Sequence, residues 1–270
     1  MGCSESKTIE TKNESKDNNK KENEIIKDEI IFENNINENL EETEKKVLKG
    51  GKNILSNKKE IFEVIHKESV TSTMPESNDY IDKMDVKKPF ILNADEQTQG
   101  KGTGNRKWNS SIKGNVYTTT CIPEHMIPEK LKDLQIFNKI VSLSIVNKLN
   151  DIEKNSFFVK QPNDILCKDG CKMGGILIKP YNGFYTIGFG VNLVGKPEEE
   201  QMREGGKKPC FLAFHTENNI PSALDFSVDV SYQILEHLKL SFEEIQKEYF
   251  SHELTSNILI GGVIKNFIKK

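Results

Sequence analysis

The stretch CKMGGILIKPYNGFYTIGFGVNL, residues 171–193, holds two apolar runs separated by Asn182-Gly183. Asn-Gly between apolar runs is a strong signal for a β-hairpin, because both residues tolerate the positive φ angles of a tight turn. The pair Asp169-Gly170 interrupts the chain in the same way just before this stretch. These turns predict an antiparallel meander of strands over residues 157–193.

Further strands are predicted upstream of the meander. Residues 61–65, 89–99 and 114–122 alternate apolar with polar side chains or are rich in Thr and Tyr, as half-buried strands are. Residues 66–77 are polar, and we predict a turn there that leads into a short helix.

Two longer helices complete the predicted elements. Apolar residues recur at helical spacing over residues 131–152, which indicates a buried helix, and residues 230–250 are predicted to form one amphipathic helix. We therefore expect an α+β protein with a mixed, largely antiparallel sheet packed on helices.

Composition divides the chain near residue 55. Residues 1–55 are rich in Lys, Asn and Glu and poor in apolar side chains, so we expect a disordered leader, followed by one domain over residues 56–270. The whole chain is 35% hydrophobic and 29% charged, with a formal net charge of −3, so its charge does not indicate nucleic-acid binding. Nor does the leader contain the paired amphipathic helices of a helix-turn-helix module.

The five cysteines are odd in number and scattered, which indicates a reducing compartment rather than a disulfide framework. Cys167 and Cys171 are close in sequence, but no histidine or second cysteine pair lies near them along the chain. We therefore predict no metal site.

The N-terminal sequence MGCSES matches the pattern for N-myristoylation at Gly2, and Cys3 offers a site for a palmitoyl chain. Two acyl chains suffice for stable anchoring, whereas one does not. No secretory signal and no apolar run of roughly 18 to 20 residues is present. The sequence predicts a cytoplasmic protein held at a membrane surface through these two residues, with an accidental match in a low-complexity tail as the alternative.

The segment GKGTGNRKW, residues 100–108, combines three glycines, three cations and the single tryptophan of the chain. Glycines allow backbone N–H groups to approach a ligand closely. Cations suit phosphate or carboxylate groups, and an indole offers a stacking face for a base. The spacing differs from that of a Walker loop, which opens a helix with Gly-Lys-Ser/Thr.

Four further segments stand in order around this loop, and together they resemble the biotin–protein ligase family. The loop is similar to that family's glycine–arginine loop ending in tryptophan, and KQPND at 160–164 resembles its Lys-Trp-Pro-Asn-Asp box. KMGGIL at 172–177 and IGFGVN at 187–192 resemble two of its strands, and TSTM at 71–74 stands at its Ser-Thr biotin contact. The resemblance covers roughly residues 60–250 and implies the fold shared with class II aminoacyl-tRNA synthetases.

The resemblance implies a reaction as well. Biotin and ATP with Mg²⁺ would form biotinyl-5'-AMP, and a lysine of a carboxylase's biotin acceptor domain would then take the biotin. The implied catalytic residues are Lys160, Arg106, Lys172 and Asp164. The implied biotin-binding residues are Ser72, Thr73, Met74, Gln97, Gly100, Lys101, Gly102, Thr103, Lys160, Gly174 and Gly175. The implied ATP-binding residues are Arg106, Lys107, Trp108, Asn163, Lys172 and Asn192.

Structural roles are open for several of these residues. Ser72 and Thr73 suit helix caps, Asn163 and Asp164 suit a turn, the strand glycines suit close packing, and Trp108 suits a core. Lys160 and Lys172 stand within apolar stretches, where a lysine without a partner is costly.

The sequence also departs from the family pattern. Gln161 replaces the usual tryptophan of the box, and Lys101 and Thr103 replace arginines of the loop. The C-terminus leaves no room for the small β-barrel of many members, and we expect it to be absent. The alternatives are a lipoate or octanoate ligase or transferase of the same superfamily, and an inactive biotin-binding module.

Overall fold

The computed structural model describes residues 58, 60–104, 106–195 and 208–253. The predicted leader, with Gly2 and Cys3, lies outside this described part of the chain, as do the residues after 253 on which the expected absence of a barrel depends. No helix among the described residues is long and apolar enough to span a bilayer.

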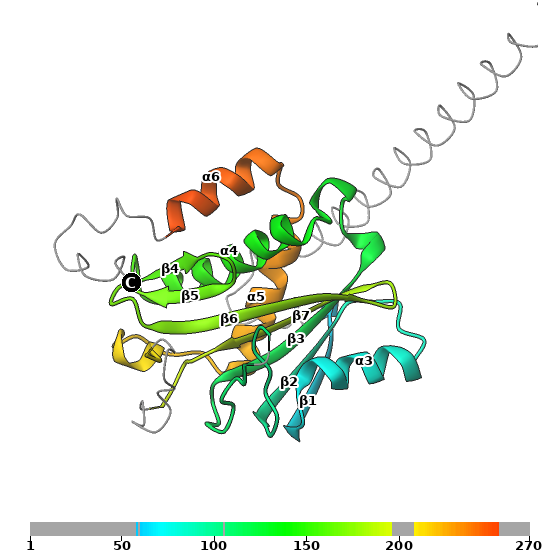
Figure 1. The fold of residues 1–270 in the computed structure, drawn as a ribbon, viewed down its shortest axis with the longest axis horizontal. Helices are drawn as coiled ribbons and strands as arrows, with labels where there is room; N and C mark the ends of the chain where they lie inside the picture. The colour runs from blue at the N-terminus through cyan, green and yellow to red at the C-terminus, as the bar shows by residue number, and fades with distance from the viewer. Residues whose placement is uncertain (1–57, 59, 105, 196–207, 254–270) are drawn as a thin grey trace, which may run out of the picture. The chain divides into compact units, whose positions relative to one another are not determined.

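A single seven-stranded sheet organises the described residues, with the strand order β1-β2-β3-β7-β6-β5-β4 (Figure 1). β1 and β2 are parallel, and all other neighbours are antiparallel. This mixed sheet confirms the predicted fold class. The strands are β1 Glu63–Val70, β2 Phe90–Gln97, β3 Val116–Pro123, β4 Phe157–Lys160, β5 Asp164–Cys167, β6 Lys172–Tyr181 and β7 Phe184–Val191.

Helices cover both faces of the sheet, because successive side chains of β3 point to opposite faces and contact a different helix on each. The Thr119 hydroxyl donates to Thr73 on one face at 2.8 Å. Thr118 and Thr120 contact α5 on the other, with Thr118 Oγ1 2.7 Å from the Ser227 hydroxyl. Figure 1 accordingly shows α3 and α5 on opposite sides of the strands. The helices are α3 Thr73–Lys83, α4 Leu134–Ile152, α5 Ala223–His237 and α6 Phe242–His252, and the short 3₁₀ helices are η1 Glu124–Met126, η2 Glu129–Leu131 and η4 Leu212–Phe214.

Each face of the sheet has its own apolar cluster. The larger one lies between the sheet, α4 and α5, and includes the fully buried Phe137 and Phe226. The smaller one lies under α3 and joins Ile81 to Phe90 and Cys121. With apolar side chains buried on both faces, the sheet is a rigid platform for the loops at its edges.

Two sequence-based boundaries are wrong. Residues 66–70 continue β1 instead of forming a turn, because Lys67 and Ser69 pair with Ala94 and Glu96 of the parallel neighbour β2. Residues 230–250 form parts of two helices, because Ser241 and Glu244 make a capping box that starts α6 anew.

Candidate active site

A cleft of about 990 Å³ lies at one edge of the sheet. The ends of β1, β2 and β7 meet the beginnings of β3 and β6 there, since Val70 pairs with Gln97 and Val191 pairs with both Val116 and Gly174. The segment between β2 and β3 covers it. The predicted site residues that line the cleft are Ser72, Thr73, Met74, Gln97, Gly100, Lys101, Gly102, Thr103, Arg106, Lys107, Trp108, Asn163, Lys172, Gly175 and Asn192.

One end of the cleft is built on the N-terminus of α3. The backbone N–H of Thr73 donates to Gln97 Oε1 at 2.8 Å, and Gln97 Nε2 donates to Ser110 Oγ at 2.8 Å. Gln97 therefore ties the helix to the glycine loop. Ser72 occupies the N-cap position and is buried, but its side chain makes no capping hydrogen bond. The Ser72 hydroxyl therefore does not cap α3, and Ser72 is one of the residues that line the cleft.

Glycines on β6 and β7 make room for two larger cleft side chains. A Cβ atom on Gly190 would stand 2.5 Å from Trp108 Nε1, and one on Gly175 would stand 3.2 Å from Trp108 Cζ3. On Gly188 it would stand 2.8 Å from Met74 Sδ. The indole therefore lies directly on the sheet, which is how a flat platform for a base would be built.

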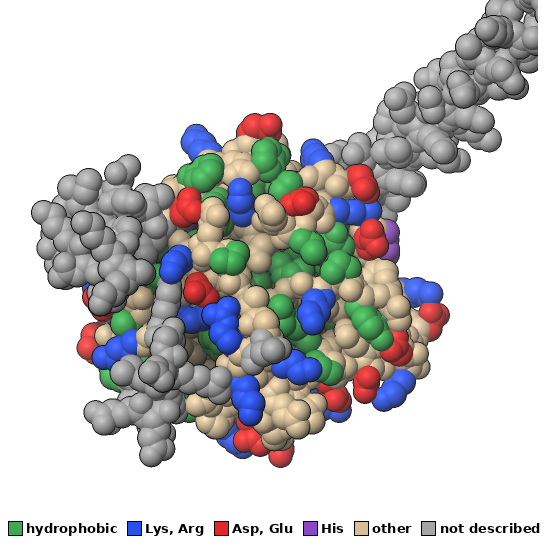
Figure 2. All heavy atoms as spheres, in the orientation of Figure 1, with side chains coloured by type: hydrophobic (Ala, Val, Ile, Leu, Met, Phe, Trp, Pro, Cys, Tyr) green, Lys and Arg blue, Asp and Glu red, His purple; other side chains and the backbone are tan. Residues whose placement is uncertain are grey.

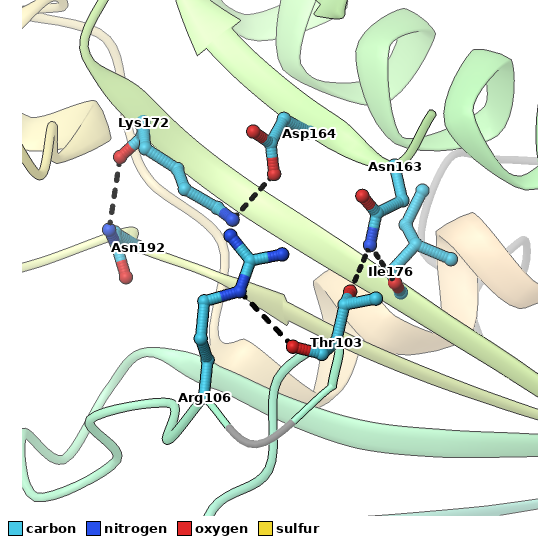
Figure 3. A network of polar contacts seen from close by, with 7 residues as sticks. All are labelled: Thr103, Arg106, Asn163, Asp164, Lys172, Ile176 and Asn192. Atoms are coloured by element: carbon cyan, nitrogen blue, oxygen red, sulfur yellow. Dashed lines mark hydrogen bonds and ion pairs between the residues drawn. The ribbon is translucent and has the colours of Figure 1, made fainter. Parts of the chain in front are cut away.

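A polar network joins the loop to the neighbouring strands (Figure 3). Lys172 Nζ lies 2.5 Å from Asp164 Oδ1 and 5.3 Å from the centre of the Trp108 ring. Asn163 Nδ2 donates to Thr103 Oγ1 at 2.7 Å and to the Ile176 carbonyl at 2.8 Å. The Arg106 side chain extends from the loop toward the Lys172–Asp164 pair.

Asn192 and Arg106 hold backbone near this network. Asn192 Nδ2 donates to the carbonyls of Lys172 and Cys210, at 3.4 and 3.0 Å. Arg106 Nε donates to the Thr103 carbonyl at 3.1 Å and so closes the loop on itself. Arg106, Lys101 and Lys107 give this part of the cleft a positive character, and Figure 2 shows basic side chains gathered over the loop between β2 and β3.

Three predicted residues do not line the cleft. Lys160 is exposed at the end of β4, so the argument that it is embedded in an apolar strand is wrong, and its catalytic role stays a prediction. Gly174 serves sheet packing, because a Cβ atom there would stand 2.9 Å from the Gly190 carbonyl. Asp164 does not line the cleft itself but pairs with Lys172, which does.

Sequence reasoning missed several lining residues that come from other segments. Tyr117 donates to the Ile112 carbonyl at 3.0 Å, and burial raises the pKa of its phenol. Ser110 could have been found from its place two residues after Trp108. Pro209 and Phe211 are brought in from beyond β7 only by tertiary contacts, and no local pattern marks them.

The architecture matches a known fold. One similar solved structure is the biotin protein ligase from Leishmania major in complex with biotinyl-5-AMP, with a TM-score of 0.62. The two chains are 23% identical, and the match covers 70% of this chain and 81% of that chain. The biotin protein ligase from Aquifex aeolicus in complex with biotin and ATP gives a TM-score of 0.59, at 24% identity over 71% of this chain and 78% of that one. The fold is therefore that of the biotin protein ligases.

Sequence comparison adds a second likeness. Residues 67–191 match the model of the Biotin/lipoate A/B protein ligase family. The chain is also 27% identical over 110 residues to the biotin–[acetyl-CoA-carboxylase] ligase of Mycobacterium tuberculosis (strain ATCC 25618 / H37Rv). That match covers 40% of this chain and 41% of the relative, so the chain spans about two fifths of the curated protein it matches.

Proposed function

We propose that this protein is an ATP-dependent biotin protein ligase, which activates biotin as biotinyl-5'-AMP and transfers it to a lysine of a carboxylase's biotin acceptor domain. The observation that carries the proposal is the Lys172–Asp164 pair beside Trp108, under a loop rich in glycine and cations. The names of the relatives, which include a biotin–[acetyl-CoA-carboxylase] ligase, support the substrate and the acceptor.

The first step would join two anions. A carboxylate oxygen of biotin attacks the α-phosphorus of ATP, and the bond from that phosphorus to the pyrophosphate oxygen breaks. Lys172 and Arg106 both point to the same region of the cleft, so they would offset the charge that gathers on the reacting phosphate (Figure 3). Mg²⁺ would supply further positive charge. Glu96 is the only carboxylate that lines the described cleft, which suits an ion held mainly by phosphates and water.

The second step needs an intact adenylate. The amine of the acceptor lysine attacks the acyl carbonyl, an amide forms, and AMP leaves. Water would compete for the same carbonyl, so the loop must cover the intermediate. The hydrogen bond from Asn163 to Thr103 attaches the loop to the body of the domain and would serve this closure. Thr103 supplies one neutral contact, where an arginine would add a charge-assisted one.

Pyrophosphate release tests the first step. With ATP, biotin and hydroxylamine as an acyl acceptor, we expect turnover with biotin but not with lipoate or octanoate. Lys172→Ala should lower the rate at least about a hundredfold, because it removes the cation beside the reacting phosphate. Lys168→Ala, an exposed lysine on the turn before β6, is the matched control and should leave the rate unchanged.

The same assay decides the role of Lys160. The sequence predicts a loss of at least about a hundredfold for Lys160→Ala as well, whereas its exposed position in the structure gives no contact with the cleft. Near-normal turnover of this variant would remove Lys160 from the mechanism. Turnover with lipoate alone would mean that lipoate, not biotin, is the substrate. No pyrophosphate release with biotin, lipoate or octanoate would contradict ligase activity.

We propose further that Gly2 and Cys3 are acylated and place the protein on a membrane surface. The motif at residues 1–6 is the support, since acylation at both residues would anchor the chain stably. Gly2→Ala should abolish labelling by a myristate analogue and shift the protein to the soluble fraction, while Ser4→Ala should change neither. Equal fractionation of the native chain and Gly2→Ala would show that the match is accidental.

A further inference from the structure

Three potential metal ligands meet beside the start of β6, and none of them lines the cleft. The Sγ atoms of Cys167 and Cys210 and a ring nitrogen of His215 all lie within 4.8 Å of one another. Cys210 Sγ is 2.7 Å from His215 Nε2. Both cysteines are buried, at 0% and 6% exposure. Cys171, whose thiol contacts that of Cys167, adds a third sulfur at the edge of the group.

The backbone holds these side chains in two short units. Cys167 and Cys171 bracket the tight turn before β6, where the Cys167 N–H donates to the Cys171 carbonyl at 3.0 Å. Cys210 and His215 bracket η4. The two units are joined directly, because the Cys210 N–H donates to the Lys172 carbonyl at 2.8 Å. The spacing is therefore Cys-x₃-Cys followed by Cys-x₄-His, which is typical of structural zinc sites.

The donor set favours a metal ion over the two alternatives. A buried cysteine pair without a metal would need no histidine, and a disulfide between Cys167 and Cys210 would leave His215 and Cys171 unused. Three sulfurs and one imidazole match a tetrahedral Cys₃His zinc site. Two sulfurs on one zinc ion lie about 3.8 Å apart, given Zn–S distances of about 2.3 Å. The ligand atoms of Cys167, Cys210 and His215 lie within 4.8 Å of one another and need only small shifts to reach that geometry. The Cys171 thiol is not in this group of three and would have to turn toward it.

We propose that Cys167, Cys210 and His215 bind a zinc ion, with Cys171 as the fourth ligand. Binding would release the thiol protons and fasten the segment 208–215 to the β5–β6 turn. Pro209 and Phe211 of that segment line the cleft, so the ion would stiffen one wall of it without touching a substrate. The site lies beyond the proposed ligase activity and does not depend on it.

Metal analysis of the full chain tests the proposal. Protein produced with zinc and dialysed against metal-free buffer should retain about one zinc ion per chain, as measured by elemental mass spectrometry. Cobalt substituted for zinc should show the intense visible bands of a tetrahedral site and the near-ultraviolet band of thiolate coordination. Cys210→Ser and His215→Ala should each lower retained zinc severalfold or more, and a strong chelator should lower the melting temperature of the native chain by several degrees.

Cys121 provides the matched control. It is a buried free cysteine of the same domain, on β3, and Cys121→Ala should keep its zinc. The cobalt spectrum is measured on the native chain, so a variant that fails to fold does not decide the question. Absence of retained zinc together with absence of the cobalt–thiolate band would overturn the proposal, as would a Cys167–Cys210 disulfide in protein isolated with its thiols blocked.

Discussion

His237 is a titratable residue of α5 that the fold buries, with 8% of its surface exposed. Its Nδ1 lies 2.8 Å from the Ser144 hydroxyl of α4, and its Nε2 lies 3.7 Å from Glu248 of α6. Burial lowers the pKa of His237, because it disfavours the imidazolium more than Glu248 and Glu236 favour it. Three helices therefore pack around an imidazole that is neutral at pH 7.

We expect His237 to make stability depend on pH. The unfolded imidazole titrates near about pH 6.5 and the folded one at lower pH, so its contribution is fully present above about pH 6.5 and is lost as the pH falls through the folded value. Urea unfolding at about pH 7.5 and about pH 5.5 should show a larger loss of unfolding free energy for the native chain than for His237→Asn. His252 shifts in the same direction but is present in both proteins, so its effect cancels. Equal losses would contradict the assignment.

At the scale of elements, β7 shapes both halves of the cleft through two glycines on one face. Gly188 leaves room for Met74, and Gly190 leaves room for Trp108. The two neighbours differ in stiffness, because the end of a methionine side chain rotates easily whereas an indole is rigid. The same small substitution should therefore have unequal effects at the two positions.

Gly190→Ala should displace the indole, whereas Gly188→Ala should move only the thioether. Trp108 is the single tryptophan of the chain, so its fluorescence reports the displacement without any substrate. We expect an emission shift in Gly190→Ala and little change in Gly188→Ala. Under the proposed function, Gly190→Ala should also raise the KM for ATP by about tenfold or more, or about 1.4 kcal/mol. An unchanged emission spectrum in Gly190→Ala would show that the strand moves instead of the indole.

At the scale of the whole molecule, Asp229 connects three segments distant in sequence. Its two oxygens pair with Lys58, which precedes β1, at 2.9 Å and with Lys148 of α4 at 2.5 Å. Burial acts to raise the pKa of Asp229, but the two lysines outweigh it and hold that pKa below its ordinary value. The carboxylate is 10% exposed and each lysine 19%, so solvent screens these pairs little.

Asp229→Asn should lower the free energy of unfolding by about 2–4 kcal/mol, because it leaves two half-buried lysines without their counter-charge. Urea denaturation of the native chain and the variant measures this difference. Asp79→Asn is the control, since the Asp79–Lys83 pair is 64% and 73% exposed. We expect a change within about 0.5 kcal/mol there. Similar effects of the two substitutions would mean that the Asp229 network is as weak as a surface pair.

Local signals in the sequence determined much of the fold. The Asn182-Gly183 turn and the apolar spacing of residues 131–152 correctly predict the β6–β7 hairpin and α4, because turn geometry and helical periodicity are encoded in neighbouring residues. The Ser241-x-x-Glu244 capping signal was also present in the sequence, yet continuous apolar spacing concealed the break between α5 and α6. The glycine-rich loop and the ordered motifs around it were enough to predict the family.

Only the tertiary structure decided which side chains meet. Lys160 and Lys172 look equivalent in the sequence, yet one is exposed at the end of β4 and the other lies beside Asp164 in the cleft. Cys167 lies close to Cys210 and His215, which are more than forty positions away in the sequence, so no local spacing could predict this cluster. Strand register and loop docking depend on contacts between distant segments, and these contacts follow from packing the whole domain rather than from the conformational preferences of neighbouring residues.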